Sequence, residues 1–261
     1  MKDRECTQTY GWYKLFQVFE NRDRLYTTDV TDDDLRLVVA EENGISIFRR
    51  NSREDDFVET SPKTIGKTIQ ADITPTGDFL LGLPHLSSSN IIVYKEQSED
   101  YVAISEFKNS VDNRNGGFLT DDHQWMVETQ KFTNGIVVYK FNPDNEKFEF
   151  SHNVAGSFIV LDYAETSSDY QYSVVGARKK VYFLEFKENK FEVFQSEDIN
   201  KSIAKPSITN DHKYVVFGDV SSTFFIQVYV FNENADNPQF NKGKMQNFAE
   251  EPIYASFSPN K

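Results

Sequence analysis

Histidines and aspartates are the side chains of this sequence best suited to bind a metal ion or transfer a proton. The four histidines are His85, His123, His152 and His212. His123 and His212 each follow an aspartate in a short polar segment, so a metal site is one interpretation. A zinc site needs its ligands to converge within about 2.0–2.3 Å of the ion, whereas polar segments of this kind also form ordinary turns. We favour turns and predict no metal site.

The run Asp32-Asp33-Asp34 raises the same question for calcium. Calcium-binding loops place oxygen ligands at alternating positions and need a glycine for the bend, and the segment from Thr31 to Leu35 has neither. The sequence also lacks the G-x-S-x-G, H-E-x-x-H and P-loop patterns of common catalytic sites. We therefore predict no catalytic residue and no cofactor, and we favour a protein that is not an enzyme.

Basic and aromatic residues form a second candidate site, for binding a partner. They fall in segments that we predict as loops, and they are Lys131, Phe132, Arg178, Lys179, Lys180 and Phe224. Arginine and aromatic side chains contribute much of the binding energy in protein interfaces, so this group could bind an acidic peptide or a partner's loop. The alternative is that the charges only solvate the turns and the rings pack inward.

A sequence repeat supplies the elements that would position these residues. Runs of apolar and aromatic residues begin at positions 45, 91, 136, 181 and 226, so the spacings are 46, 45, 45 and 45. β-Branched and aromatic residues favour strands, and no stretch shows the apolar periodicity of a helix. A polar segment precedes each run, with the residue types that tight turns require. These segments are 31–34, 74–78, 120–123, 166–169 and 209–212.

Each repeat therefore divides into four strands, here called a, b, c and d, which is the content of a propeller blade. We predict an all-β fold, a β-propeller of four-stranded antiparallel blades with five complete repeats, and place the loop residues named above between strands b and c. The predicted blades of the single domain 1–261 span 25–65, 66–111, 112–156, 157–202 and 203–250, with partial-blade strands at 10–20 and 252–261. The partial strands lead us to expect a fragment of a longer protein, with an open ring and an exposed sheet edge near Tyr254–Phe257.

One repeat resembles a known family. Ile73-Thr74-Pro75-Thr76-Gly77-Asp78-Phe79-Leu80 is similar to the passage of WD-repeat propellers from strand a through a turn into strand b. Tyr94 and Tyr139 stand where that family usually has the Trp of its Trp-Asp pair, but Lys95 and Lys140 follow them. The Gly-His dipeptide that opens a typical repeat is also missing. The chain thus resembles divergent WD-repeat-like propellers, with lactonase-like propellers as the second choice.

The two resemblances imply different functions. A WD-repeat-like propeller implies a non-catalytic scaffold that binds a partner protein or peptide through its rim loops. A lactonase-like propeller implies a hydrolase with a metal in the central channel. We favour the scaffold and keep the hydrolase as the alternative.

Charge and composition narrow the range of partners. The net charge of −13 argues against binding to nucleic acid or to an anionic membrane, which requires a basic face. No window approaches 18 apolar residues, so we expect no membrane insertion. The one cysteine, Cys6, cannot form an internal disulfide, and the charged start Met1–Glu5 is unlike a secretory signal. We expect an intracellular, cytoplasmic protein whose partners are other proteins or peptides.

Overall fold

The computed structural model describes residues 25–60, 62–63, 67–84, 90–107, 116–130, 135–158, 161–203, 205–218, 225–233 and 238–247. Within these ranges the chain forms strands and turns and no helix, so no described helix could cross a membrane. In chain order the strands are β1 (Leu25–Val30), β2 (Arg36–Glu41), β3 (Gly44–Arg49), β4 (Val58–Glu59), β5 (Thr68–Ile73), β6 (Phe79–Pro84), β7 (Ile91–Gln97), β8 (Asp100–Phe107), β9 (Gly116–Leu119), β10 (Trp125–Gln130), β11 (Gly135–Asn142), β12 (Lys147–Asn153), β13 (Leu161–Thr166), β14 (Tyr172–Lys187), β15 (Lys190–Ser202), β16 (Ser207–Ile208), β17 (Tyr214–Gly218), β18 (Phe225–Asn232) and β19 (Gln239–Asn247).

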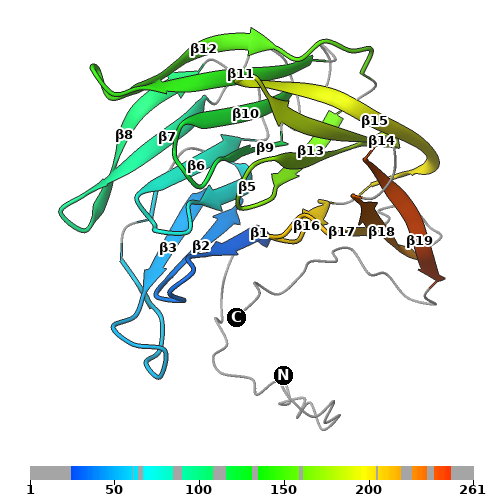
Figure 1. Cartoon of the computed structure of the whole chain (residues 1–261). Coiled ribbons are helices and arrows are strands. Elements are labelled where there is room, and N and C mark those ends of the chain that lie inside the picture. The colour runs from blue at the N-terminus through cyan, green and yellow to red at the C-terminus, as the bar shows by residue number, and fades with distance from the viewer. Residues whose placement is uncertain are drawn as a thin grey trace, which may run out of the picture.

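The strands form five antiparallel sheets, each made of consecutive strands. Their orders are β1-β2-β3-β4, β5-β6-β7-β8, β9-β10-β11-β12, β13-β14-β15 and β16-β17-β18-β19. In Figure 1 the sheets follow one another around a common axis, with the first strand of each sheet innermost. These inner strands contact one another in sequence, β1 with β5, β5 with β9, β9 with β13 and β13 with β16. The predicted β-propeller is confirmed.

The fourth sheet contains three strands, but the long strand β14 contributes two of its four antiparallel segments. Residues 173–177 of β14 pair with β13, and residues 178–187 pair with β15. The N–H of Phe186 donates a 2.8 Å hydrogen bond to the carbonyl oxygen of Gln171, so β14 folds back on itself. Lys179 lies at the reversal with a φ of 71°. The turn between strands b and c is therefore a two-residue turn, formed by Arg178 and Lys179.

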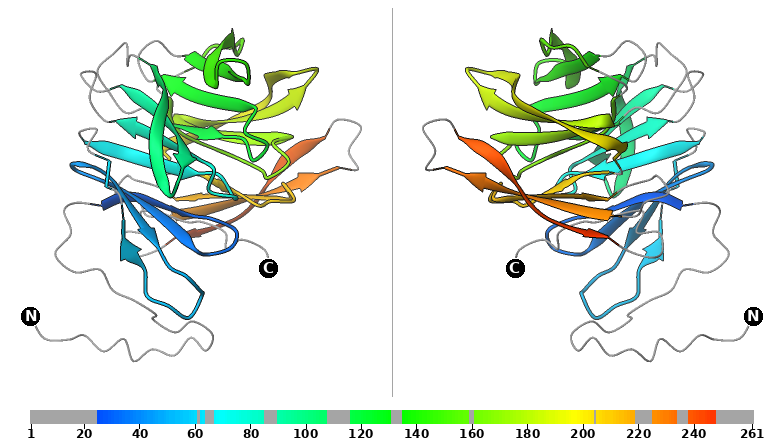
Figure 2. Two further views of the ribbon diagram at one scale, coloured as in Figure 1. Left: turned by 90° about the vertical axis from the view of Figure 1, so that its left-hand side faces the viewer. Right: turned by 90° about the vertical axis from the view of Figure 1, so that its right-hand side faces the viewer.

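Apolar side chains fill the space between each sheet and the next. Four core clusters occupy the four junctions between successive described sheets, and Figure 2 shows the sheets stacked face to face. Strand c buries residues on both of its faces in the first four sheets, as in β3, where the first five residues are buried, whereas burial alternates along β18 in the fifth sheet. Burial on both faces explains why the sequence of such a strand is apolar throughout instead of alternating.

The structure does not describe the two ends of the predicted propeller. The partial-blade strands at 10–20 and 252–261, and the edge expected near Tyr254–Phe257, lie outside the described residues. Among the residues that are described, no strand pairing joins the fifth sheet to the first.

Candidate functional site

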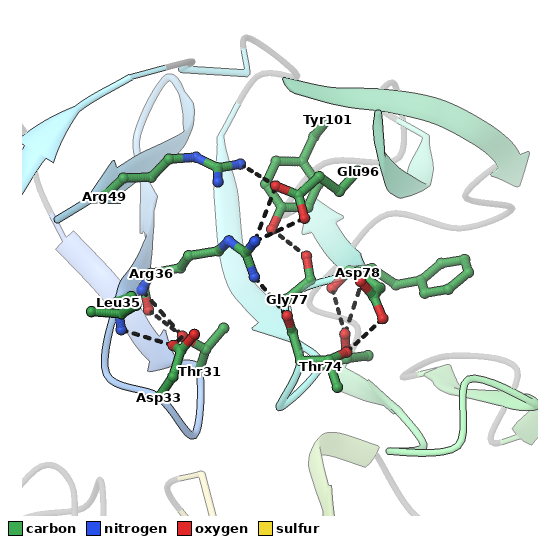
Figure 3. A network of polar contacts seen from close by, with 12 residues as sticks. Thr31, Asp33, Leu35, Arg36, Arg49, Thr74, Gly77, Asp78, Glu96 and Tyr101 are labelled. Atoms are coloured by element: carbon green, nitrogen blue, oxygen red, sulfur yellow. Dashed lines mark hydrogen bonds and ion pairs between the residues drawn. The ribbon is translucent and has the colours of Figure 1, made fainter. Parts of the chain in front are cut away.

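The turn between strands a and b of each sheet is built around one hydroxyl residue. Thr31 Oγ1 donates a 2.6 Å hydrogen bond to Asp33 Oδ1 and accepts one of 3.1 Å from the N–H of Arg36 (Figure 3). Asp33 Oδ1 also accepts a 2.9 Å bond from the N–H of Leu35. The same bonds recur around Thr120 and Asp122, Ser167 and Asp169, and Thr209 and Asp211. The polar segments predicted as turns are turns, and their side chains fix them.

The third residue after each hydroxyl has a left-handed backbone, and two of the five are histidines that contact the preceding sheet. They are His123 and His212, with φ values of 61° and 49°. The ring centroid of His123 lies 4.9 Å from that of Phe79, and the centroid of His212 lies 4.8 Å from that of Tyr172. Burial lowers the pKa of His123. Both histidines therefore act as packing residues between sheets.

The other two histidines are not part of these contacts between sheets. His152 lies on β12 with Nδ1 3.0 Å from Ser151 Oγ, and His85 is outside the described residues. Burial, and then the charge of Lys190, lower the pKa of His152. In the described part of the chain, no three His, Cys, Asp or Glu side chains are grouped so as to hold a metal ion.

Charged side chains join the first sheet to the second on the rim that carries these turns. Arg36 Nη1 donates a 2.6 Å hydrogen bond to the Thr76 carbonyl oxygen, and its Nη2 lies 3.0 Å from Glu96 Oε2. Arg49 Nη2 lies 2.7 Å from Glu96 Oε1. The hydroxyl of Tyr101 donates to the Gly77 carbonyl oxygen at 2.6 Å. Burial, and then the charge of Glu96, raise the pKa of Tyr101 to about 12, so the phenol stays a donor at neutral pH.

Polar side chains of the inner strands, here called the channel residues, form hydrogen bonds to the next inner strand. Asp29 Oδ2 accepts a 2.9 Å hydrogen bond from the N–H of Ile73, and Asp72 Oδ2 accepts one of 2.9 Å from the N–H of Leu119. Similar side-chain bonds from Thr27 and Gln70 to the next inner strand lie beside these two. The channel side chains thus hold successive sheets together.

One lysine lies near several carboxylates of these inner strands. Lys205 Nζ lies 3.0 Å from Glu165 Oε2, and both side chains are largely buried. Burial opposes the charge of Lys205, but Glu165, Asp29 and Asp72 outweigh it and raise the pKa of the lysine. Burial raises the pKa of Asp29 to about 6, and burial together with Asp29 and Glu165 raises the pKa of Asp72 well above its usual range.

Asp121 extends the acidic group towards the rim. Burial, and then the charges of Asp32, Glu165 and Asp29, raise the pKa of Asp121 to about 7. Carboxylates with pKa values near neutrality can donate or accept a proton, which is the chemistry of a general acid or base. The oxygens of Asp29, Asp72 and Glu165 already bind backbone amides or Lys205, however.

The structure describes three of the six residues predicted to bind a partner. Arg178 and Lys179 are exposed at the reversal within β14. Lys180 was predicted in the same loop, but it lies on the strand opposite Asp198, with Nζ 3.6 Å from Asp198 Oδ1, because the turn is only two residues long. Lys131, Phe132 and Phe224 lie outside the described residues.

The channel residues were missed by the sequence analysis, although a signal for them exists. Asp29, Asp72 and Glu165 each stand two positions before the hydroxyl residue of their turn. Aligning the repeats on that hydroxyl places all three at one level of the inner strands. Lys205 stands four positions before its hydroxyl, Thr209, so the alignment alone does not show that it reaches Glu165.

Comparison with known proteins finds similarity only in structure. No family model and no curated protein matches the sequence. The periplasmic gluconolactonase of Pseudomonas aeruginosa is similar over 88% of this chain and 73% of its own, at 10% identity and a TM-score of 0.69. A chain of the mitotic checkpoint complex is similar over 90% of this chain and 70% of its own, at 10% identity and a TM-score of 0.69.

A third similar structure is hydrazine synthase of Kuenenia stuttgartiensis, over 94% of this chain and 72% of its own, at 14% identity and a TM-score of 0.64. Proteins with such different names share this architecture because a propeller can carry many unrelated sites. At these identities the similarity establishes the fold alone. The chain is a β-propeller, compatible with both the WD-repeat-like and the lactonase-like types.

Proposed function

We propose that this propeller is a non-catalytic scaffold that binds a partner protein or peptide through the rim carrying the b–c turns. The observation that carries the proposal is the turn at Arg178 and Lys179, where two exposed cations stand on a tight hairpin of an otherwise acidic chain. Backbone pairing on both sides holds this hairpin in place. A rigid basic turn suits an acidic segment of a partner, because a preorganised surface loses little entropy on binding.

The bonds of the inner-strand carboxylates also favour the rim as the binding surface. Asp29 and Asp72 accept hydrogen bonds from the next inner strand, and Glu165 binds Lys205. The oxygens of these carboxylates are therefore already engaged in bonds that hold neighbouring sheets together. Exposed charges on the rim are thereby the better candidates for contact with another molecule.

Charge substitutions at the two ends of the β14–β15 pair test the proposal. Immobilised protein would be used to capture partners from a lysate of its native cells, and the captured proteins would be identified by mass spectrometry. The double variant Arg178→Ser/Lys179→Ser is expected to lose the main captured protein. The matched control is Lys187→Ser/Lys190→Ser, which removes the same charge from the exposed c–d end of the same strands. Equal capture by both variants would reject this rim as the binding surface.

A second candidate function is a lactonase-like hydrolase with a metal in the channel. The raised pKa values of Asp29 and Asp121 favour it, since protonatable carboxyl groups near neutral pH are typical of active sites. Elemental analysis of the purified protein separates the two candidates. A stoichiometric divalent metal that is lost in Asp121→Asn, with the fold intact, would favour the hydrolase.

A further inference from the structure

Four junctions between successive sheets each bring two equivalent side chains together near the rim of the a–b turns. One stands five positions after the hydroxyl of its turn, and the other five positions after the first residue of the next apolar run. At three junctions both are aromatic, with ring centroids 4.6–5.5 Å apart, and the pairs are Phe79 with Phe141, Trp125 with Phe186 and Tyr172 with Phe231. Between the first two sheets the pair is Arg36 and Glu96. One junction therefore departs from the repeat, and such departures often mark functional positions.

This junction has two cations on one acid. Arg49 Nη2 lies 2.7 Å from Glu96 Oε1, and Arg36 Nη2 lies 3.0 Å from Glu96 Oε2. The residue that corresponds to Arg49 in the second sheet is Lys95, which has a carboxylate of its own, with Nζ 2.6 Å from Glu146 Oε1. The sharing of one acid by two cations is thus a feature of the first junction and not of the repeat.

Other acids on this rim are bound to other partners. Asp34 Oδ2 lies 3.1 Å from Arg53 Nε. Asp33 Oδ1 accepts hydrogen bonds from the hydroxyl of Thr31 and the N–H of Leu35. Within the described residues, the two guanidinium groups that share one carboxylate therefore contact no other acid.

The guanidinium group of Arg49 has unused hydrogen-bond donors. It carries several N–H groups in a planar fork, but its bond to Glu96 is the one that it makes within the described residues (Figure 3). Its Nε is buried without a partner there. The side chain is 20% exposed and lies over the ring of Tyr101, with Cζ 5.8 Å from the centroid. Unbonded donors at a largely buried position are costly, so an acceptor from outside the chain would stabilise them.

Arg36 is held in place beside it. Its Nη1 donates a 2.6 Å hydrogen bond to the carbonyl oxygen of Thr76. A Cβ at Gly77 would lie 2.1 Å from this Nη1, so the glycine leaves the room that the guanidinium group occupies. The two guanidinium groups are thus fixed around one carboxylate, and a ligand would lose little entropy in ordering them.

We propose that Arg36 and Arg49 form a binding site for one further carboxylate group, supplied by a small acid or by an acidic side chain of a partner. Guanidinium groups pair with carboxylates through parallel hydrogen bonds. Two cations and Glu96 leave one positive charge, which a single carboxylate neutralises, whereas a doubly charged phosphate would exceed it and be repelled by Glu96. The site lies on the rim of the a–b turns and is separate from the basic b–c turn at Arg178.

Titration of the full chain with sodium acetate at constant ionic strength tests the site. NMR follows the Nε–H signals of the arginine side chains, and those of Arg36 and Arg49 are expected to shift saturably while that of Arg178 does not. Arg49→Gln should weaken binding, followed at Arg36, about tenfold or more, because it removes a charge-assisted hydrogen bond. The matched control is Lys95→Gln, which removes the corresponding charge of the next junction and should bind like the wild type.

The titration of the wild type needs no substitution, so it decides the matter even where Arg49→Gln fails to fold. Arg49→Lys is the second variant, which keeps the charge, loses the planar fork and should also bind more weakly. No saturable shift in the wild type, or equal affinity in Arg49→Gln and Lys95→Gln, would overturn the proposal.

Two further probes identify the chemistry of the ligand. Tighter binding of a capped Gly-Glu-Gly peptide than of acetate would support a partner's side chain as the source of the carboxylate, and equal binding would support a small acid. Tighter binding of inorganic phosphate than of acetate would overturn the assignment to a carboxylate.

Discussion

Arg36 on β2 and Glu96 on β7 form an ion pair between the first two sheets, with Nη2 and Oε2 3.0 Å apart. Arg49 shares the same carboxylate, so a single negative charge faces two guanidinium groups that are only about a fifth exposed (20–21%). Figure 3 shows the three side chains meeting above the turn at Gly77. The pair holds the two sheets in register at their rim.

Glu96→Gln should therefore destabilise the protein by about 2–3 kcal/mol, because it leaves two partly buried cations without their counter-charge. Urea unfolding measures the change. Glu99→Gln, an exposed acid in the adjacent turn, is the control and should lie within about 0.5 kcal/mol of the wild type. A loss no larger than that of the control would show that the pair contributes nothing measurable.

Gly77→Ala should cost about 1–3 kcal/mol for two reasons. Gly77 has a φ of 78°, which L-residues rarely adopt, and a Cβ there would clash with the guanidinium of Arg36. The double variant Gly77→Ala/Arg36→Ala separates the two causes. The clash predicts that the second substitution costs less in the Gly77→Ala background than alone, and simple additivity would contradict it.

Thr120→Val should cost about 1–2 kcal/mol, because it removes a buried hydroxyl that bonds both Asp122 and the N–H of Trp125. The shape of the side chain is nearly unchanged, so lost packing does not account for the effect. Thr28→Val on β1 is the matched control, since Thr28 is exposed. Thermal unfolding of both variants gives the comparison, and equal melting temperatures would mean that the hydroxyl does not stabilise the turn.

The channel carboxylates predict how stability changes with pH. Asp121 and Asp29 have folded-state pKa values raised to about 7 and about 6, above the ordinary value of 3.8. Between pH 4 and 7 the folded state therefore binds more protons than the unfolded state, and stability falls as pH rises through this window. Asp121→Asn should remove part of the fall and stabilise the protein at pH 8 by about 1–2 kcal/mol, after allowance for solvent screening.

Urea titrations at pH 5 and pH 8 measure this difference. The exposed Asp144→Asn is the control, because its carboxyl lies in a c–d turn far along the chain from the channel residues. A variant Asp121→Asn that keeps the full wild-type pH dependence would show that Asp121 does not carry the raised pKa.

The sequence by itself determined the repeat, the strands and the turns, because these depend on residues close together in the chain. The spacing of the runs beginning at Ile45 and Ile91, and the hydroxyl and aspartate at Thr31 and Asp33, were enough to predict them. Local hydrogen bonds such as Thr31 to Asp33 need no distant partner. Antiparallel pairing of neighbouring strands then follows from short connections.

Only the tertiary structure decided which side chains meet across sheets. Lys205 and Glu165 are 40 positions apart, and so are Arg36 and Thr76. No local pattern marks such pairs, because their meeting depends on how far each sheet is rotated from the next around the ring. The same rotation brings Asp29 and Asp72 close to Glu165, where burial and repulsion from neighbouring carboxylates raise their pKa values.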